Sequence, residues 1–314
     1  MKSRNVLTLF LFISFTFLLS SCSGQMTATS WPGYSIHEDK VYLSYQTGVY
    51  AVNLSNGTLA WQYPENTDSK RNYYAPPVVT DEQLLVGDYL NTLHSLNLSN
   101  GTEKWKYETT NGRFISGVIV DQDTIVAGAS DTNFYALDLT GNLRWKFETT
   151  AANWAKPASD GTTAYLPSMD NFLYAVDLKS GSQLWKTDLG GAVVGGLTMD
   201  SDFLYIGTLS NEVLSINKKD GAVAWRFSTD GAVWAIPTIK DDVLYLGDTA
   251  STVYAIDAMT GATLWRLEGI GKPIIGSAGV IDKGVIFTTE DGKLTAVDFN
   301  GQRLWEKQIN GKLY

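Results

Sequence analysis

Short hydrophobic runs alternate with polar turns along this chain. Between residues 193 and 225, four runs rich in β-branched and aromatic residues occupy Val193 to Met199, Phe203 to Gly207, Val213 to Asn217 and Ala222 to Trp225. Each run is bounded by Gly, Asn, Asp or Ser, which is typical of strands separated by turns. The pattern therefore predicts a unit of about 40 residues that holds four short antiparallel strands.

The same unit recurs along the chain, and one tryptophan marks each copy. The first two of these tryptophans are 44 residues apart and each later pair is 40 apart: Trp61, Trp105, Trp145, Trp185, Trp225, Trp265 and Trp305. A fixed period of this length indicates a repeat architecture, and four strands per repeat is the pattern of a propeller blade. We therefore predict an all-β fold, a seven-bladed β-propeller of four-stranded antiparallel blades.

Each tryptophan closes a short motif that predicts how blades hold together. In the copy from Ala175 to Trp185, a small residue is followed by Asp177 and then by Gly181. Gly supplies a positive φ in the turn between the third and fourth strands, and Asp can hydrogen-bond the local backbone there. Because the small residue leaves room for an indole, we expect the seven tryptophans to dock one blade onto the next.

This motif resembles the tryptophan-docking repeat of the quinoprotein-like (PQQ-repeat) β-propellers, and the resemblance covers residues 31–307. When Gly271 and Gly311 are placed in register, Tyr314 aligns with Ile274, one residue before the next innermost strand. The first blade begins with that strand, at Trp31. We therefore expect the ring to close after seven blades.

The N-terminal residues predict export and lipidation. Lys2 and Arg4 precede an apolar stretch from Val6 to Leu19, and this arrangement is typical of a secretory signal. The following Leu19-Ser20-Ser21-Cys22 resembles the bacterial lipobox, which implies lipidation of Cys22. The alternative is an ordinary signal peptide with an incidental cysteine.

The predicted domains follow from this assignment. Residues 1–22 are a lipoprotein signal peptide with a lipobox that ends at Cys22, residues 23–30 are a polar tether, and residues 31–314 are the propeller. A lipid anchor implies an extracytoplasmic protein on a membrane. Because Ser23 follows the cysteine, we expect the outer membrane, facing the periplasm, in a Gram-negative host. In any other host we expect the outer face of the cell membrane.

One position of the innermost strands carries aromatic residues in four blades. The aromatic copies are the candidate binding residues Trp31, Tyr74, Trp154 and Trp234, and the aliphatic copies are Ile115, Val194 and Ile275. A ring of aromatics at one mouth of the central channel would hold an extended peptide or a flat ligand. The alternative is that bulky and small residues alternate to fill a tapering channel.

Basic residues near these strands are candidates for a positive lining at the same mouth. Arg71, Arg113 and Lys156 stand out in a chain whose formal net charge is −9. A positive lining would suit a carboxylate-bearing partner, and the alternative is scattered surface charge. The negative net charge argues against a nucleic-acid partner.

Other polar residues predict structural roles. The acidic residues at the turns after the second strands, such as Asp88, Asp131 and Asp170, are explained by turn propensity, so we predict no metal site. His94 replaces a tyrosine at a strand position that matches Tyr174, which favours a satisfied structural role over catalysis.

The sequence predicts a binding protein that is not an enzyme and needs no cofactor. The resemblance to quinone-dependent dehydrogenases would imply a vicinal Cys-Cys disulfide over the cofactor, but Cys22 is the sole cysteine. A short lipidated chain of these repeats resembles the outer-membrane assembly lipoproteins (BamB-like), which are non-enzymatic scaffolds.

That second resemblance implies a scaffold in outer-membrane β-barrel protein assembly. Its implied partners are the membrane, through the lipid anchor, and a component of the assembly machinery or an unfolded barrel precursor, bound by loops at one propeller face or by strand addition. Two alternatives remain. One is a surface or periplasmic lipoprotein that binds a small ligand or glycan at the channel mouth, and the other is a PQQ-dependent oxidoreductase.

Overall fold

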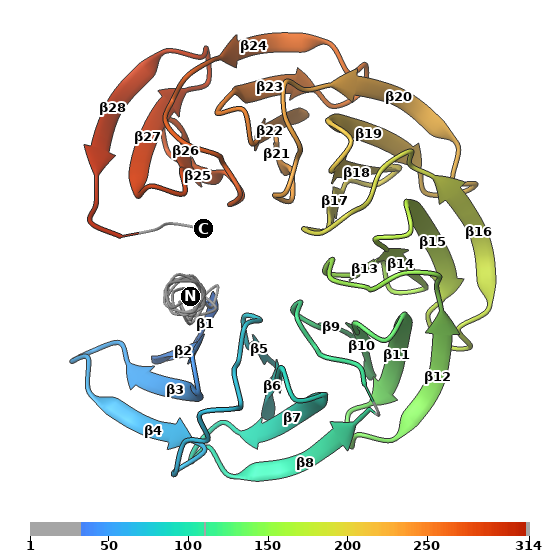
Figure 1. Ribbon diagram of the computed structural model, residues 1–314, viewed down its shortest axis with the longest axis vertical. Helices are drawn as coiled ribbons and strands as arrows, with labels where there is room; N and C mark the ends of the chain where they lie inside the picture. Colours follow the sequence, from blue (N-terminus) through green and yellow to red (C-terminus); the bar gives the residue numbers. More distant parts are fainter. Residues whose placement is uncertain (1–32, 110, 312–314) are drawn as a thin grey trace, which may run out of the picture. The chain divides into compact units, whose positions relative to one another are not determined.

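The computed structural model describes residues 33–109 and 111–311, and the strands of this part form seven sheets of four (Figure 1). Blades 1 to 3 contain β1 (Gly33–His37), β2 (Lys40–Tyr45), β3 (Gly48–Asn53), β4 (Leu59–Tyr63), β5 (Val78–Val79), β6 (Gln83–Gly87), β7 (Thr92–Asn97), β8 (Glu103–Glu108), β9 (Ile119–Asp121), β10 (Thr124–Gly128), β11 (Asn133–Asp138) and β12 (Leu143–Glu148). Blades 4 and 5 contain β13 (Ala158–Ser159), β14 (Thr163–Pro167), β15 (Phe172–Asp177), β16 (Gln183–Asp188), β17 (Leu197–Met199), β18 (Phe203–Thr208), β19 (Glu212–Asn217) and β20 (Val223–Ser228). Blades 6 and 7 contain β21 (Thr238–Lys240), β22 (Val243–Gly247), β23 (Val253–Asp257), β24 (Thr263–Leu267), β25 (Gly279–Ile281), β26 (Gly284–Thr288), β27 (Lys293–Asp298) and β28 (Arg303–Gln308).

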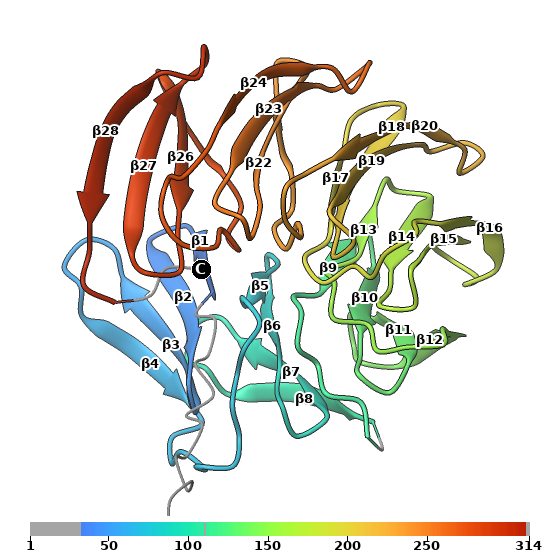
Figure 2. The same cartoon turned by 45° about the horizontal axis from the view of Figure 1, so that its top comes forward.

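Each blade is one continuous stretch of chain whose four strands pair in sequence order and antiparallel. The first strand of each blade faces the central axis and the last strand forms the rim, as the two views in Figures 1 and 2 show. The prediction of a seven-bladed propeller is confirmed. Among the described residues, no helix is long and apolar enough to cross a membrane.

The innermost strands are shorter than the sequence pattern predicts. The run from Val193 to Met199 gives only three strand residues, Leu197 to Met199. The residues before them pack across blades instead of pairing within their own sheet. A Cβ on Gly195 would lie 2.2 Å from the carbonyl oxygen of Trp234, and an isolated bridge joins Gly196 to Lys156. The segments around the axis therefore form close backbone contacts between neighbouring blades.

The tryptophans dock as the motif predicts. Within a blade, Trp185 lies opposite Ala175, and a register shift follows directly after this pair. The corresponding shift occurs next to the small residue in every blade. The indole then reaches the next blade, where a Cβ on Gly221 would lie 2.7 Å from a ring carbon of Trp185. Glycine is required here because its φ is +74° and because the indole fills the space of a side chain.

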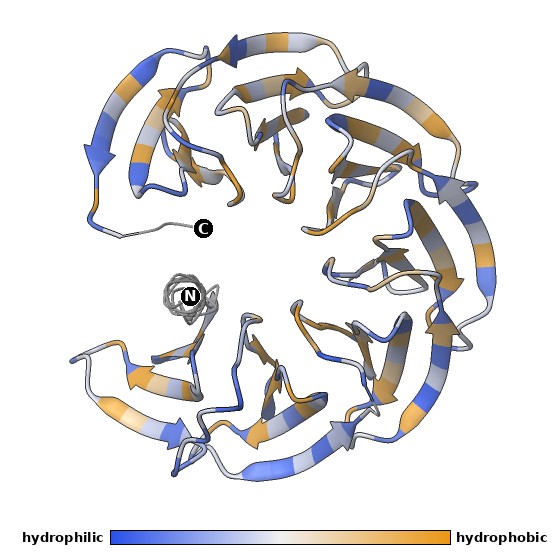
Figure 3. Cartoon of the chain, in the orientation of Figure 1, coloured by the Kyte–Doolittle hydropathy of each residue, from blue (hydrophilic) through white to orange (hydrophobic). Residues whose placement is uncertain are grey.

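Six of the seven docking contacts have the same geometry. The indole Nε1 donates to a backbone carbonyl of the next blade over 2.8–3.0 Å, with the pairs Trp61–Leu98, Trp105–Leu139, Trp145–Leu178, Trp185–Lys218, Trp225–Ala258 and Trp265–Phe299. The apolar core lies between the blades and is built in this way from residues of adjacent sheets. The rim strands alternate hydrophobic and hydrophilic residues (Figure 3), as strands covered on one face do.

The junction between blades 7 and 1 differs from the other six. Trp305 is 44% exposed, whereas Trp61 and Trp145 are each 7% exposed. Among the described residues, no atom lies within 4 Å of a Cβ placed on Gly57, the blade 1 glycine that Trp305 would meet. Contrary to the expectation of a closed ring, the docking contact is not made between these two blades within residues 33–109 and 111–311.

Candidate functional site

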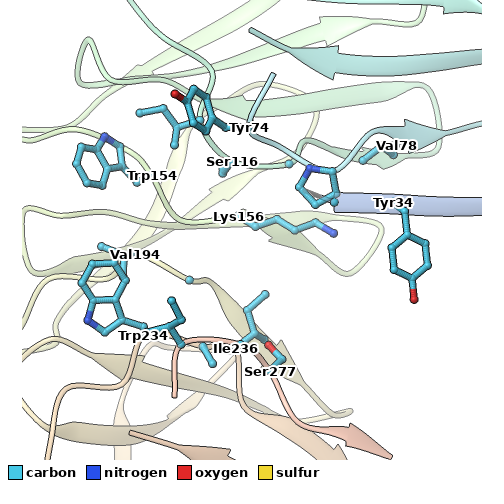
Figure 4. A pocket seen from close by; sticks show the side chains of 18 of the residues that line it. Tyr34, Tyr74, Val78, Ser116, Trp154, Lys156, Val194, Trp234, Ile236 and Ser277 are labelled. Carbon is cyan, nitrogen blue, oxygen red and sulfur yellow. The ribbon is translucent and has the colours of Figure 1, made fainter. Parts of the chain in front are cut away.

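The main cavity lies on the central axis and has a volume of about 460 Å³ (Figure 4). All seven blades contribute to its wall, because each sends the loop before its innermost strand, or that strand itself, to the axis. The wall includes three of the predicted aromatic residues, the three aliphatic ones and one of the predicted cations: Tyr74, Trp154, Trp234, Ile115, Val194, Ile275 and Lys156. The structure thus brings together most of the residues that the innermost position singles out.

The aromatic residues of the wall are held at different depths. Trp154 and Trp234 are half-buried and lie near each other on one side of the close-up in Figure 4. Tyr74 is buried and packs against Tyr89, with ring centroids 5.0 Å apart. The small residues between them have a packing role, because the backbone at Gly195 approaches the Trp234 carbonyl. The small residues therefore pack around the axis, and the two indoles line the cavity.

Lys156 extends through the cavity toward the side where Tyr34 stands (Figure 4). Its backbone is fixed by a hydrogen bond from its N–H to the Gly195 carbonyl, 3.1 Å long. The ammonium is accessible from the channel and has no ion-pair or hydrogen-bond partner in the described part of the chain. Because the surrounding blades remove part of its hydration, the pKa of Lys156 is lowered from its usual value.

Two further polar atoms of the wall residues lack partners. Trp154 Nε1 and Ser116 Oγ are buried without a hydrogen-bond partner among the described residues. Because both atoms are buried, the Lys156 ammonium is the group of these three that a ligand in the cavity can reach. A ligand that offers acceptor atoms and a flat apolar surface matches this chemistry.

The wall does not suit a calcium-assisted quinone. Calcium takes oxygen ligands, above all carboxylates, and no Asp or Glu is among the described residues that line the cavity. More widely, the described residues contain no group of three or more His, Cys, Asp or Glu side chains placed to hold a metal ion.

Of the three basic residues predicted to line this mouth, Lys156 lies in the cavity wall. Arg71 and Arg113 do not line the cavity. Arg71 forms an ion pair with Asp88, with Nη1 2.5 Å from Oδ2. The Arg113 guanidinium lies 4.4 Å from the ring centroid of Tyr89. The repeat pattern could not predict these two contacts, because the contacting residues occur together in one blade only. Trp31 and Cys22 lie outside the described residues.

A buried polar cluster in blade 2 was missed by the sequence analysis. Both ring nitrogens of His94 meet carboxylates, Nε2 at 2.9 Å from Asp88 and Nδ1 at 2.8 Å from Glu103. Tyr63, from blade 1, donates to the same Glu103 oxygen over 2.6 Å. Burial raises the pKa of Glu103, but the hydrogen bonds from Tyr63 and His94 outweigh burial and lower it overall. His94, only 1% exposed, is thus a structural residue that links two blades.

The acidic turn residues serve local structure. Asp131 accepts a hydrogen bond from the Tyr135 hydroxyl over 2.6 Å, and Asp170 accepts one from Tyr174 over 2.7 Å. Asp88 also accepts from the backbone N–H of Thr92. These contacts explain the recurrence of acidic residues without a bound ion.

Comparison with known proteins places the fold in one family. A family model described as outer membrane protein assembly factor BamB matches residues 45–188 and 169–312. The crystal structure of BamB from Moraxella catarrhalis is similar, with a TM-score of 0.76, 19% identity, and coverage of 89% of this chain and 85% of that chain. The computationally designed Ika8 protein is also similar, with a TM-score of 0.75, 15% identity, and coverage of 89% and 87%. At these identities the likeness to solved structures shows the fold alone. No curated protein sequence matches the chain.

Proposed function

Because this chain belongs to the family described as outer membrane protein assembly factor BamB, we propose that it is a non-enzymatic scaffold lipoprotein that aids outer-membrane β-barrel assembly. The observation that carries the proposal is the family match, which extends over residues 45–312. The partner would be a component of the assembly machinery or an unfolded barrel precursor. The contact would be made by propeller loops, by strand addition or by an exposed apolar face.

The proposal includes a lipid anchor at Cys22. A positive start, an apolar stretch and the Leu19-Ser20-Ser21-Cys22 sequence support cleavage before Cys22 and acylation of its thiol. Two acyl chains give stable membrane attachment, and the tether of residues 23–30 keeps the propeller near the lipid surface. In a Gram-negative host, this places the protein on the periplasmic face of the outer membrane.

A pull-down tests the scaffold. The tagged, lipidated protein and a secreted Cys22→Ala form are extracted in mild detergent, and co-purified proteins are identified by mass spectrometry. We expect the lipidated protein to retain a β-barrel assembly protein well above an untagged background, and metabolic labelling with a fatty acid to mark it but not the Cys22→Ala form. Recovery of background proteins only would overturn the scaffold as a stable complex.

A second candidate function rests on the cavity. The Lys156 ammonium, which has no partner among the described residues, lies in a wall that also contains two half-buried indoles, and this combination favours a small acceptor-bearing ligand or a glycan. A ligand screen that follows tryptophan fluorescence tests this function. A ligand of the cavity should change the emission of the unmodified protein but not that of Trp154→Ala or Trp234→Ala, and its affinity should fall in Lys156→Met.

The third alternative, a PQQ-dependent oxidoreductase, has little support. The chain has one cysteine, so a vicinal disulfide cannot form, and no carboxylate is among the described residues of the cavity wall. Calcium-dependent dye reduction after addition of the quinone would establish this activity and overturn the non-enzymatic proposal.

A further inference from the structure

The open junction between blades 7 and 1 exposes two surfaces that the propeller covers everywhere else. Blade 1 presents Tyr34, Ile36 and Leu54, which are 67%, 60% and 50% exposed. The register of the strands places Ile36 and Leu54 at the positions of Val79 and Leu98 in blade 2. Those two residues pack in the core between blades 1 and 2. The free face of blade 1 is therefore an interior surface without its neighbour.

The free face of blade 7 combines an apolar anchor with positive charge. Trp305 is 44% exposed, and its indole nitrogen has no hydrogen-bond partner in the described chain. Two residues later, Lys307 occupies a position that is aromatic in four blades, as at Tyr63 and Phe147, and uncharged in the other two. Lys307 is exposed and has no carboxylate partner among the described residues.

The lysine makes this face unlike the other docking faces. At the matching position of other blades, Tyr63 packs on His94 and Phe147 packs on Tyr174, with ring centroids 5.5 and 5.1 Å apart. A charged ammonium needs water or an opposite charge in place of such a ring contact. The two free faces therefore differ in character: blade 1 offers an apolar surface, and blade 7 offers an indole beside a cation.

We propose that this open junction binds an amphipathic antiparallel β-segment of a partner protein, a hairpin with one apolar face and one polar, acidic face. Sheets pack face to face at about 10 Å, so a sheet is the element that both neighbouring blades are shaped to meet. The apolar face of the hairpin covers Ile36 and Leu54, and its polar face meets Trp305 and Lys307.

The inference rests on the proposed function and names the kind of partner. Strands of membrane β-barrels alternate apolar and polar side chains, so each hairpin of such a barrel has one face of each kind before it enters the membrane. A second copy of this chain fits less well. Head-to-tail packing of copies, with blade 7 of one on blade 1 of the next, would cover both faces but would bury the Lys307 ammonium against the apolar surface of blade 1.

Binding of a synthetic hairpin to the soluble Cys22→Ala protein tests the inference. The probe is a fluorescent hairpin with strands of about six residues, Val, Leu and Tyr on one face, and Thr and Glu on the other. Fluorescence anisotropy should show saturable binding. The double variant Ile36→Lys/Leu54→Lys should weaken it by about tenfold or more, because it places charges under the apolar face. Lys307→Glu should weaken it through like-charge repulsion with the glutamates.

Two matched variants control for nonspecific effects of new charge. Leu184→Lys and Leu304→Lys also replace exposed leucines, in blades 4 and 7, which are 56% and 44% exposed. Both leucines directly precede the docking tryptophan at the register shift of the rim strand, a position that is exposed in every blade. Both variants should bind the hairpin as the unmodified protein does. A hairpin with Thr and Glu on both faces should not bind.

Several outcomes would overturn the inference. These are no saturable binding, equal loss in the Leu184→Lys and Leu304→Lys controls, or self-association in sedimentation that Ile36→Lys/Leu54→Lys abolishes. The pull-down distinguishes failure of this inference from failure of the proposed function. A retained β-barrel assembly protein with no hairpin binding rejects the junction alone. Hairpin binding without any retained assembly protein rejects the scaffold and leaves the junction as a binding surface.

Discussion

At the residue scale, Gly181 stands in a place where only glycine fits, and Gly57 provides its matched control. Both have a positive φ, +71° and +70°. A Cβ at Gly181 would lie 2.7 Å from a ring carbon of Trp145, whereas a Cβ at Gly57 would meet nothing within 4 Å. The two positions therefore share the backbone strain of a left-handed residue and differ in packing.

This difference predicts unequal effects of alanine. Gly181→Ala and Gly57→Ala should each lose about 1 kcal/mol to the left-handed backbone. Gly181→Ala should lose roughly 1–3 kcal/mol more, because the methyl group displaces the docked indole. Urea unfolding followed by tryptophan fluorescence measures both. Equal losses in the two variants would show that Gly57 is covered in solution.

Asp160 predicts how stability depends on pH. Burial by itself raises the pKa of Asp160, but hydrogen bonds from the Tyr165 hydroxyl at 2.7 Å and from the backbone N–H of Thr163 outweigh burial and bring it down to about 2. In the unfolded chain the carboxyl titrates near 3.8. The carboxylate therefore stabilises the fold at pH values above about 4, and this contribution is lost as the pH falls toward 2.

The measurement is acid unfolding of Asp160→Asn against the unmodified protein. At pH 7 the variant should be less stable by up to about 2 kcal/mol, and the difference should shrink as the pH falls from 4 to 2. Asp81→Asn is the control, because Asp81 is exposed and has no hydrogen-bond or ion-pair partner among the described residues. A difference for Asp160→Asn that stays constant over this range would contradict the assignment.

The polar residues show how far single positions can be interpreted from sequence. Lys156 was predicted near the channel because it lies on a repeated innermost segment, and the structure places it in the cavity wall. Arg71 also lies on the segment that precedes an innermost strand, but its side chain forms an ion pair with Asp88. The carboxylate lies 17 residues further on and has no counterpart at most matching positions, so the repeat carries no signal for the pair.

At the element scale, the blade is the unit that the sequence specifies best. Short hydrophobic runs indicated the second and third strands, which are buried on both faces between neighbouring blades, and the docking tryptophan marked the fourth strand. The innermost strands were overestimated. Near the axis, backbone contacts between blades, such as that of Gly195 with Trp234, compete with pairing inside the sheet, and hydrophobicity alone does not distinguish the two.

The docking contacts predict two classes of tryptophan. Trp145 is 7% exposed and donates to the Leu178 carbonyl over 2.9 Å. Trp145→Ala should therefore cost roughly 3–5 kcal/mol, as expected for removal of a large buried side chain. Trp305 is 44% exposed and lacks that acceptor in the described chain, so Trp305→Ala should cost roughly half of this or less. Chemical unfolding of the two variants gives the comparison, and similar losses would mean that Trp305 is docked in solution.

At the scale of the whole molecule, the number of blades could be predicted and the open junction could not. The count follows from seven copies of one motif, each with its own tryptophan. Whether the seventh indole reaches the first blade depends on the rotation between successive blades, summed over six junctions. The sequence of a single repeat does not specify this summed rotation. The local sign that the last face differs is Lys307, a charged residue at a position that is uncharged in the other six blades.

The open junction predicts a gradient of local stability around the propeller. Each blade contacts only its neighbours, so blades 3 to 5 are held on both faces, whereas blades 1 and 7 are each held on one. Local opening should therefore need the least free energy in the end blades. Hydrogen exchange at native pH should be slowest in β10, β14 and β18 and faster in β2 and β26, which are the corresponding second strands of their blades. A ring sealed between Trp305 and Gly57 would instead give every blade two neighbours and similar protection. Addition of the amphipathic hairpin should slow exchange in β2 and β26 first, because it supplies the missing neighbour to both.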